Sequence, residues 1–214
     1  YVEKLLKYIK IDIYGSCTNF KNAKPDPCKK SANEEKCYVD LYKSYKFYLA
    51  FENSQCNNYI TEKFFKLYNP NYLFETNLIP VVRGAKQEHY ELIAYNNRSF
   101  INADKFDSPK ALANYLNYLN RNNTAYLEYL KWKYELYDKF KSELLNKTNN
   151  KTDYFNDSPF CEICSKLHDK SFMNNKNNRN YKISDWFNPR KECWDKPYPI
   201  SLWKNFAKFF GYCV

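Results

Sequence analysis

Glycine is scarce in this sequence, with three glycines among 214 residues. P-loops and the Gly-x-Gly-x-x-Gly turn of dinucleotide-binding folds both need closely spaced glycines. Neither pattern is present, so both of these classes of nucleotide site are excluded. Histidine is also rare, with two residues, and no Asp-x-Asp pair stands at the end of a predicted strand. We therefore expect no dedicated metal site.

Long apolar runs are missing as well. No apolar stretch approaches the ~20 residues that a membrane-spanning helix needs, so the sequence predicts no membrane span among these residues. The sequence begins at Tyr1, inside an amphipathic stretch. Such a start is typical of a chain cut within a domain, and we expect an N-terminally truncated domain here.

Aromatic residues and positive charge are abundant. Hydrophobic residues make up 44% of the chain and aromatic residues 20%, and the net charge is +10. This apolar content is enough for a core that does not depend on disulfides or metals. A basic surface attracts anions, whether nucleic acid, acidic lipid or a nucleotide-sugar. Charge alone does not choose among them, and a merely solubilising surface is equally consistent with it.

Cysteines and glycosylation sequons both point to an oxidising compartment. The chain has eight cysteines, a number that favours disulfides and the secretory pathway. Asn-x-Ser/Thr sequons stand at Asn97, Asn122, Asn146, Asn150 and Asn156. We expect glycosylation at the first four. The fifth sequon is weak, because a proline directly follows its serine.

Short apolar strands alternate with helical patterns along residues 1–146. The predicted strands cover 11–14, 45–51, 78–82 and 99–102. The predicted helices cover 1–10, a segment capped by Asn58, a segment opened by Ser108-Pro109, and 124–146. The third helix carries an apolar stripe of Leu112, Leu116 and Leu119. Alternating strands and helices predict an α/β fold with a parallel sheet covered on both faces.

Two regions have a different character. Residues 16–37 are rich in lysine and contain three cysteines, which predicts a disulfide-stapled loop. Residues 147–214 are predicted to form an irregular Cys-rich C-terminal extension. In that extension Cys161, Cys164 and His168, with Cys193, could form a zinc site. Disulfides are the favoured interpretation for a secretory protein.

The segment 46–63 carries the strongest chemical signal. A buried strand leads through a polar loop to a helix start, and ligands of open α/β sheets bind at the carboxyl ends of strands. A helix N-terminus suits a diphosphate. Lys63 could add a cation, Glu62 could accept hydrogen bonds from ribose hydroxyls, and Asn53 could bind sugar or phosphate. The plainer alternative is an ordinary strand–loop–helix with a surface Glu–Lys pair.

These residues resemble the signature of a known family. Tyr45–Ser54, followed by Tyr59-Ile60-Thr61-Glu62-Lys63, is similar to the α1,3/4-fucosyltransferases of glycosyltransferase family 10. Further matching motifs follow in order: Pro80-Val81-Val82 with Gly84, His89-Tyr90-Glu91, Ser99-Phe100-Ile101, Ser108-Pro109-Lys110, Leu112-Ala113 with Tyr115-Leu116, Tyr126–Tyr129, and Trp132-Lys133. The resemblance covers roughly residues 1–135. Linked motifs in one order are specific where a single motif is not.

The resemblance implies a fold and a reaction. The family has a GT-B type architecture, in which two Rossmann-like domains face each other across a cleft. Residues 1–146 would form the GDP-fucose-binding Rossmann-like domain, and residues 147–214 the extension. The implied reaction is inverting transfer of fucose from GDP-fucose to GlcNAc of a glycoprotein glycan, either the N-glycan core or a LacNAc-type antenna.

The resemblance also assigns residues. Asn53, Tyr59, Glu62 and Lys63 would bind the donor, and Lys63 would neutralise charge on the leaving GDP. The general base would be a glutamate of the N-terminal domain, which is absent from this sequence, so no catalytic residue is assigned. No cofactor is implied, although a divalent cation could stimulate the reaction without being essential. The implied location is the Golgi lumen, with a type II membrane anchor outside this chain.

The sequence departs from the family pattern at two places. The chain between Lys63 and Pro80 is several residues longer than usual, which predicts an extended or bulged helix. Thr76–Ile79 also replaces the small residues expected before Pro80. Arg83 is equally consistent with a place in the cleft and with a place on the surface.

Two other functions stay open. A catalytically silent domain would bind GDP and transfer nothing. A basic module would bind nucleic acid or heparin, although the lysines are scattered along the sequence and the sequons point to the lumen.

Overall fold

The computed structural model describes residues 1–15, 20, 23–146, 165–174 and 189–194. The contacts divide the chain into one unit of Tyr1–Glu135 with Cys193–Val214 and a second unit of Leu136–Glu192. Some predictions concern residues outside the described ones: those on Cys161 and Cys164, and on the sequons at Asn150 and Asn156. Within the described part, no helix is long and apolar enough to cross a membrane.

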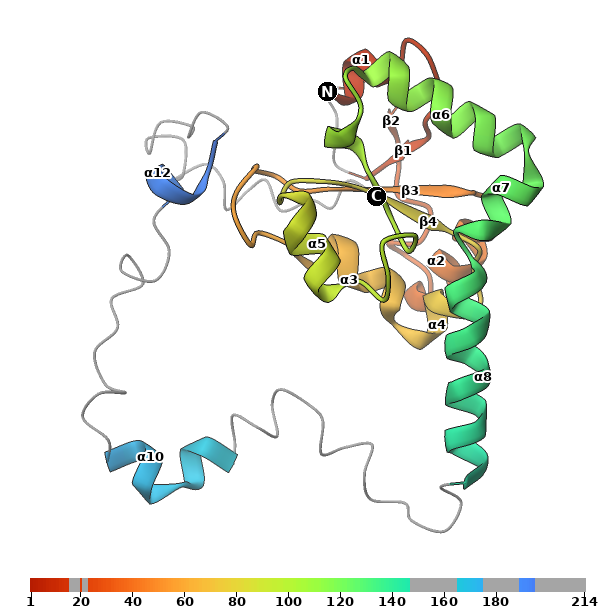
Figure 1. The fold of residues 1–214 in the computed structure, drawn as a ribbon. Coiled ribbons are helices and arrows are strands. Elements are labelled where there is room, and N and C mark those ends of the chain that lie inside the picture. The colour runs from red at the N-terminus through yellow and green to blue at the C-terminus, as the bar shows by residue number, and fades with distance from the viewer. Residues whose placement is uncertain (16–19, 21–22, 147–164, 175–188, 195–214) are drawn as a thin grey trace. The chain divides into compact units, whose positions relative to one another are not determined.

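A parallel three-stranded sheet forms the centre of the first unit (Figure 1). Strands β3 (Phe47–Phe51), β4 (Ile79–Arg83) and β5 (Ile101–Asn102) lie in the order β3-β4-β5. Both pairs are parallel, with Phe47 opposite Ile79 and Val81 opposite Ile101. The predicted parallel sheet is therefore confirmed. A second parallel pair joins β1 (Ile13–Tyr14) to β2 (Ala23–Lys24), and β2 falls where the sequence predicted a loop.

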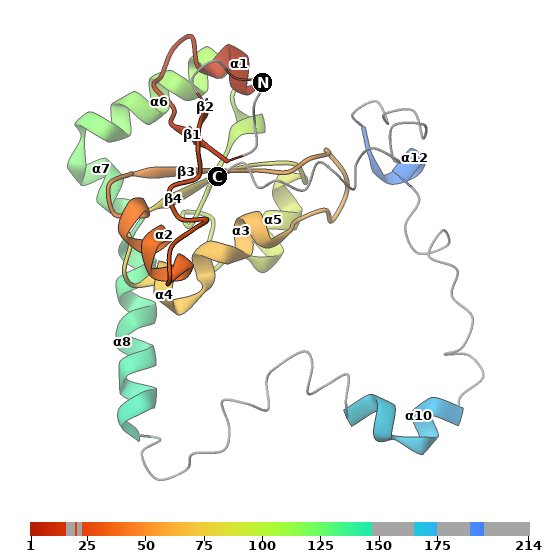
Figure 2. The same ribbon diagram turned by 180° about the vertical axis from the view of Figure 1, so that it is seen from behind.

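Helices cover both faces of the larger sheet, as Figures 1 and 2 show. On one side lie α1 (Val2–Leu5), α6 (Pro109–Arg121) and α7 (Asn123–Glu128). On the other lie α2 (Glu34–Tyr42), α3 (Glu62–Phe65), η1 (Lys66–Tyr68), α4 (Pro70–Leu73) and α5 (Gln87–Ile93). The short helix η2 (Ala103–Lys105) follows β5. Helix α8 (Lys131–Asn146) begins in this unit, and α10 (Lys170–Asn174) and α12 (Pro189–Glu192) belong to the second.

The apolar side chains of the strands point alternately to the two faces of the sheet and so contribute to two separate cores. Tyr48, Ala50 and Val82 pack with the aromatic residues of α3 and α5, including Phe64 and Tyr90. The alternate positions of β4 and β5 pack with the leucines of α1 and α6. Successive side chains of a strand point to opposite faces. Both faces of β4 are therefore buried, which explains its continuous apolar sequence.

Helix α6 follows its sequence signals closely. The Ser108 hydroxyl accepts a hydrogen bond from the Ala111 backbone N–H at 3.1 Å, and proline occupies the first turn. The predicted stripe of Leu112, Leu116 and Leu119 is buried. The cap, the proline and the stripe are all confirmed.

The single helix predicted over 124–146 is wrong, because the structure has α7 and α8 instead. Tyr126 and Leu130 pack into the core beneath α6. Trp132 stacks against Tyr95, and the Lys133 ammonium donates to the Thr76 carbonyl at 3.0 Å. A single straight helix would not place both sets of side chains against their partners. The chain therefore bends between α7 and α8, where there is no glycine or proline.

The long segment between Lys63 and Pro80 folds into three short helical pieces, α3, η1 and α4. Asn69 caps α4 by accepting from the Asn71 backbone N–H, and Pro70 follows it. Tyr72 and Leu73 of α4 are buried. The sequence predicted an extended or bulged helix here, and the structure has an interrupted helix instead. Its additional turn, α4, contributes to the core.

The Lys- and Cys-rich region 16–37 contains a disulfide between Cys28 and Cys37, as its composition predicted. It also contains the start of α2, which the sequence analysis did not predict. Asn33 caps that helix, and Glu34 and Glu35 occupy its first turn. Acidic residues there are favourable, because they lie near the positive end of the helix dipole.

Candidate functional site

The candidate site is the loop that joins the carboxyl end of β3 to α3. Asn58, predicted as the helix cap, has a left-handed backbone with φ of 56° and does not cap α3. The cap is Thr61, whose backbone is extended and whose hydroxyl accepts from the Lys63 N–H. The prediction was wrong because asparagine both caps helices and tolerates the left-handed region, and here it makes a turn three residues before the cap.

The carboxylate of Glu52 organises this loop. Its Oε1 accepts from the Thr61 backbone N–H at 2.7 Å, and its Oε2 accepts from the Thr61 hydroxyl at 2.7 Å. The side chain is 0% exposed. A buried carboxylate is stable only when it is paired and hydrogen-bonded. Sequence reasoning did not assign Glu52 to the site, although an acidic residue directly after a buried strand was a usable signal.

Gly84, at the end of β4, makes room for Glu52. A Cβ at this position would lie 2.6 Å from both Cβ and Cγ of Glu52, and Gly84 has φ of 156°. Both the contact and the backbone conformation require glycine. The carbonyl of neighbouring Arg83 accepts from the Glu52 backbone N–H at 2.7 Å. Glu52 is thus fixed by its backbone as well as by its side chain.

Lys63 places its ammonium among three oxygens. Nζ lies 3.2 Å from Oε1 of Glu62, 3.3 Å from the Thr61 hydroxyl and 3.5 Å from Oε2 of Glu52. Burial lowers the pKa of Lys63, but the carboxylates of Glu52 and Glu62 outweigh it and hold this pKa above its usual value. The side chain is 21% exposed, so the cation is held in place and still reaches solvent.

The structure brings Glu62 and Lys63 together and places Tyr59 nearby. Burial, and then the charge of Glu52, raise the pKa of Tyr59. The Glu62 side chain is 58% exposed, which leaves it accessible to a ligand. Asn53 follows Glu52 directly and is exposed at the start of the loop.

The helix that follows the loop is short. Helix α3 has four residues, and a helix dipole grows from many aligned peptide units. Its contribution to binding a diphosphate is therefore small. The positive charge of the site comes mainly from Lys63. The lysine, rather than the helix N-terminus, is therefore the main candidate for binding a diphosphate.

Neighbouring polar residues hold the loop rather than enlarge the site. Arg83 binds Asp104 through Nε at 3.0 Å, and its guanidinium lies over the ring of Tyr1. Asp104 also accepts from Gln55 at 3.2 Å. Nδ1 of His89 accepts from the Asn58 backbone N–H at 3.0 Å, which supports the turn there. Arg83 and His89 thus have structural partners.

A disulfide connects the loop to the C-terminal part of the chain. Cys56 is bonded to Cys193, and the two form an antiparallel bridge. The Trp194 backbone N–H donates to the Gln55 carbonyl at 3.0 Å. Cys193 is therefore not available as a zinc ligand, as the disulfide interpretation predicted.

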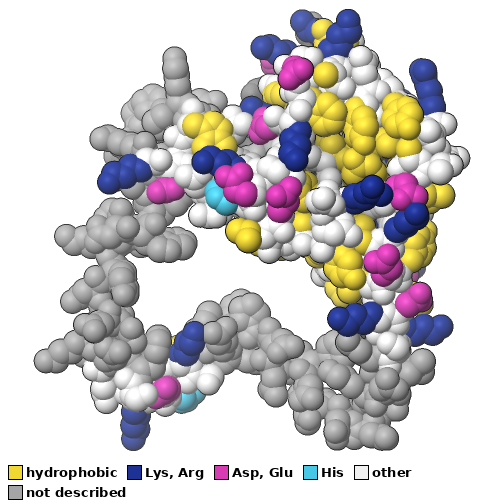
Figure 3. Space-filling view, in the orientation of Figure 1, with side chains coloured by type: hydrophobic (Ala, Val, Ile, Leu, Met, Phe, Trp, Pro, Cys, Tyr) yellow, Lys and Arg dark blue, Asp and Glu magenta, His cyan; other side chains and the backbone are white. Residues whose placement is uncertain are grey.

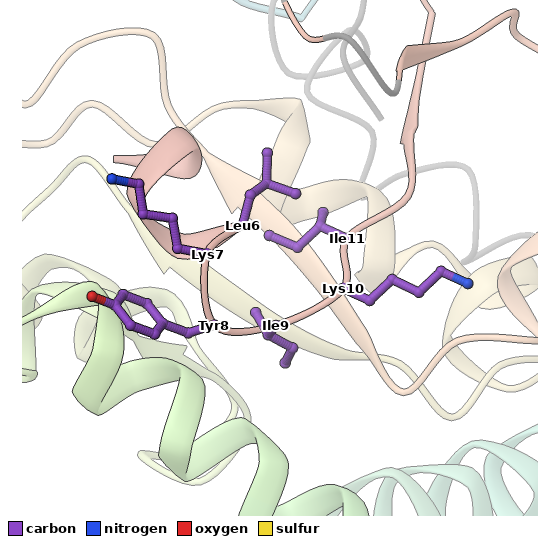
Figure 4. Close-up of a pocket in the computed structure, with 6 residues that line it drawn as sticks. All are labelled: Leu6, Lys7, Tyr8, Ile9, Lys10 and Ile11. Carbon is purple, nitrogen blue, oxygen red and sulfur yellow. The ribbon is translucent and has the colours of Figure 1, made fainter.

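Two cavities of the first unit lie apart from the loop. Figure 4 shows the shallower one, lined by residues 6–11, where Lys7 and Lys10 point away from each other. A larger cavity of about 750 Å³ is lined mainly by apolar residues of α1, β1 and β3. None of Asn53, Tyr59, Glu62 and Lys63 lines either cavity. The candidate site is thus distinct from both of these cavities, and the side chain that carries its cation is 21% exposed.

The sequons differ in their surroundings. Asn97 is exposed. Asn122 is half-buried and caps α7, with Oδ1 accepting from the Ala125 N–H and Nδ2 donating to the Tyr118 hydroxyl. Asn146 ends α8.

Comparisons with known proteins agree with the motifs. Residues 1–186 match the profile described as "Glycosyltransferase family 10 (fucosyltransferase) C-term". The chain is 37% identical over 96% of its length to Glycoprotein 3-alpha-L-fucosyltransferase A of Drosophila melanogaster, covering 34% of that protein. It is 39% identical over 63% of its length to Alpha-(1,3)-fucosyltransferase fut-1 of Caenorhabditis elegans, covering 28% of it. It is also 33% identical over 78% of its length to GDP-fucose protein O-fucosyltransferase 3 of Danio rerio, covering 36%.

The chain spans about a third of the length of these curated relatives. Most of it, however, falls within one family profile. The chain therefore belongs to glycosyltransferase family 10, the fucosyltransferases, and matches the C-terminal part of that family.

Proposed function

We propose that this chain is the donor-binding part of an α1,3-fucosyltransferase, a Rossmann-like domain of a GT-B type enzyme. The full enzyme transfers fucose from GDP-fucose to GlcNAc of a glycoprotein glycan, either an N-glycan core or a LacNAc-type antenna. Family membership supports the fucosyl donor. The observation that carries the site is the Lys63 ammonium, held beside the loop at the carboxyl end of β3.

Each site residue has a role in this proposal. Lys63 neutralises the charge that develops on the diphosphate of the leaving GDP, and a fixed cation is effective there because it needs no reorganisation. Glu62 accepts hydrogen bonds from the ribose hydroxyls, and Asn53 and Tyr59 contact the nucleotide. The transfer inverts the anomeric centre, and its general base belongs to the domain that faces this one across the cleft.

The disulfides and the family membership also bear on the cellular compartment of the protein. Disulfides at Cys28–Cys37 and Cys56–Cys193 suit an oxidising compartment. We propose the Golgi lumen, with a type II membrane anchor outside this chain. The reaction needs no cofactor, and a divalent cation stimulates it at most without being essential.

The donor proposal is tested by nucleotide titration. Thermal unfolding of the chain is followed with GDP and with UDP, and a ligand that binds only the folded state adds about 2.7 kcal/mol at a hundredfold excess over its Kd. We expect stabilisation by GDP and less by UDP. Lys63→Ala should weaken GDP binding about tenfold to a hundredfold, the range for a lost charged hydrogen bond.

Lys43→Ala is the matched control. Lys43 also pairs with carboxylates, Asp40 and Glu75, but on the exposed surface. Its loss should leave GDP binding unchanged. A Lys63→Ala chain that binds GDP as tightly as the parent would remove Lys63 from the site.

The other functions make different predictions. A polyanion-binding module would show affinity that falls steeply with salt and no preference for GDP. The charge distribution in Figure 3 argues against a polyanion-binding module, because lysine and arginine are scattered over the face shown and form no stripe. A silent GDP-binding domain would bind GDP normally and show no fucose transfer even within the full-length protein.

A further inference from the structure

Glu52 is buried, charged and bonded to two parts of the site at once. Its carboxylate accepts both hydrogen bonds that Thr61 donates, and it lies 3.5 Å from the Lys63 ammonium. Because its side chain is 0% exposed, Glu52 cannot touch a ligand bound at the surface. Any effect it has on a ligand is transmitted through Thr61 and Lys63.

The surroundings of Glu52 compensate the burial of its carboxylate. Moving a carboxylate out of water is unfavourable by several kcal/mol unless its partners compensate. Gly84 leaves space for the side chain, and any larger residue there collides with it. An apolar residue at the end of β3 would avoid the desolvation cost, but it would leave the Thr61 N–H, the Thr61 hydroxyl and the Lys63 ammonium without this acceptor.

We propose that Glu52 is a positioning residue for the donor diphosphate: its buried charge fixes the Lys63 ammonium and the Thr61 turn in the binding geometry. This inference rests on the proposed donor site. It separates the role of Glu52 from that of Glu62, which is exposed and free to meet the nucleotide directly.

The role depends on charge, and substitutions can separate charge from shape. Glu52→Gln keeps the size of the side chain and an oxygen that can accept from the Thr61 N–H. Its amide N–H₂ would replace Oε2, which accepts from the Thr61 hydroxyl and faces the Lys63 ammonium. Lys63 would then keep only the exposed carboxylate of Glu62 as its counter-charge and should be less firmly held. Glu52→Asp keeps the charge but is one methylene shorter.

The experiment compares GDP with guanosine, which lacks the phosphates. Calorimetric titration of the whole 214-residue chain is carried out for the parent, Glu52→Gln, Glu52→Asp and the control Glu75→Gln. Glu75 pairs with Lys43 on the surface, away from this loop. We expect Glu52→Gln to weaken GDP binding about tenfold or more, as for a lost charge-assisted contact, and to leave guanosine binding unchanged. Glu52→Asp should recover part of the loss.

A second readout is the pH profile of GDP affinity. Without the charge of Glu52, Lys63 should lose its proton at lower pH, so the alkaline loss of GDP binding should begin earlier in Glu52→Gln. In a Lys63→Ala background, Glu52→Gln should cost little further affinity, because both changes act through the same ammonium.

The outcomes are distinct. Equal weakening of GDP and guanosine, or no weakening of either, overturns the positioning role of Glu52. A parent chain that prefers UDP or binds neither nucleotide overturns the proposed donor site and this inference with it. If Glu52→Gln fails to fold, Glu52→Asp decides: its shorter side chain should weaken GDP binding partly and leave guanosine binding unchanged, and equal weakening of both ligands, or of neither, refutes the inference.

Discussion

Cys56 is bonded to Cys193, 137 positions later in the sequence. The bond therefore ties a late segment of the chain to the loop that leads into α3 and Lys63. Reduction should affect the candidate site as well as the C-terminal residues.

Cys193→Ser is expected to lower the free energy of unfolding by about 2–5 kcal/mol, because the bond closes a long loop. The variant should also weaken GDP binding. Cys37→Ser is the matched control, because it breaks the disulfide Cys28–Cys37, which spans nine positions. Its cost should be smaller, with GDP binding retained. Denaturant unfolding and GDP titration measure both effects, and equal GDP affinities for the two variants would contradict this prediction.

Gly84→Ala should destabilise the chain by about 1–3 kcal/mol, because the new methyl group meets Glu52 at 2.6 Å. The displaced carboxylate should also weaken GDP binding. Gly15→Ala is the control for backbone strain, because Gly15 also has a positive φ, of 94°. It should lower the melting temperature and leave GDP affinity unchanged. A Gly84→Ala chain with parental stability would show that the end of β4 adapts to the methyl group.

Lys133 gives the chain a distinctive pH dependence. Its ammonium is buried and donates to the Thr76 carbonyl. Burial lowers the pKa of Lys133 to about 8. The folded chain therefore releases this proton near pH 8, whereas the unfolded chain keeps it until about pH 10.4. Between these values the unfolded state binds more protons, so stability rises with pH.

The expected gain from Lys133 between pH 7.5 and pH 9.5 is about 1–2 kcal/mol. Lys133→Met should remove this rise, and it should be more stable than the parent at pH 7, where the parent buries a charge. Urea unfolding across this pH range tests the difference between the two proteins. Parallel pH profiles for parent and variant would show that Lys133 is not the source.

Asn122 and Asn97 should respond differently to substitution. Asn122 caps α7, so Asn122→Ala should cost about 1 kcal/mol of stability in unglycosylated chain. Asn97 is exposed, and Asn97→Ala should change stability little. When the chain is secreted from a glycosylating host, Asn97→Gln should remove the mass of one glycan. An unchanged mass would show that this sequon is not used.

Local signals predicted much of the fold. The Ser108-Pro109 start of α6 and its leucine stripe are determined by nearby residues, and β3 and β4 are apolar runs long enough to identify. The bend between α7 and α8 was missed because it depends on distant partners, such as Thr76 beneath Lys133. Strand β2 is two residues long and exists through its pairing with β1.

The site, like the fold, was predicted only where it depends on residues that are close in sequence. Glu62 and Lys63 are adjacent in sequence, so their pairing needed little information about the fold. Glu52 was missed because its role depends on space beside Gly84, which is 32 positions away in the numbering. Thr61 and Asn58 are both acceptable caps by residue type, and only the backbone distinguishes them.

The charges around Lys63 have a consequence for selectivity. One ammonium faces the carboxylates of Glu52 and Glu62, so this cluster carries a net negative charge when no ligand is present, although the whole chain carries +10. The basic surface attracts anions from a distance, whereas at the cluster the exposed carboxylate of Glu62 opposes a bare anion. Inorganic phosphate and pyrophosphate should therefore compete poorly, since neither has the ribose hydroxyls that would engage Glu62. A nucleotide that carries both the diphosphate and the ribose should therefore be retained even where free phosphate is in excess.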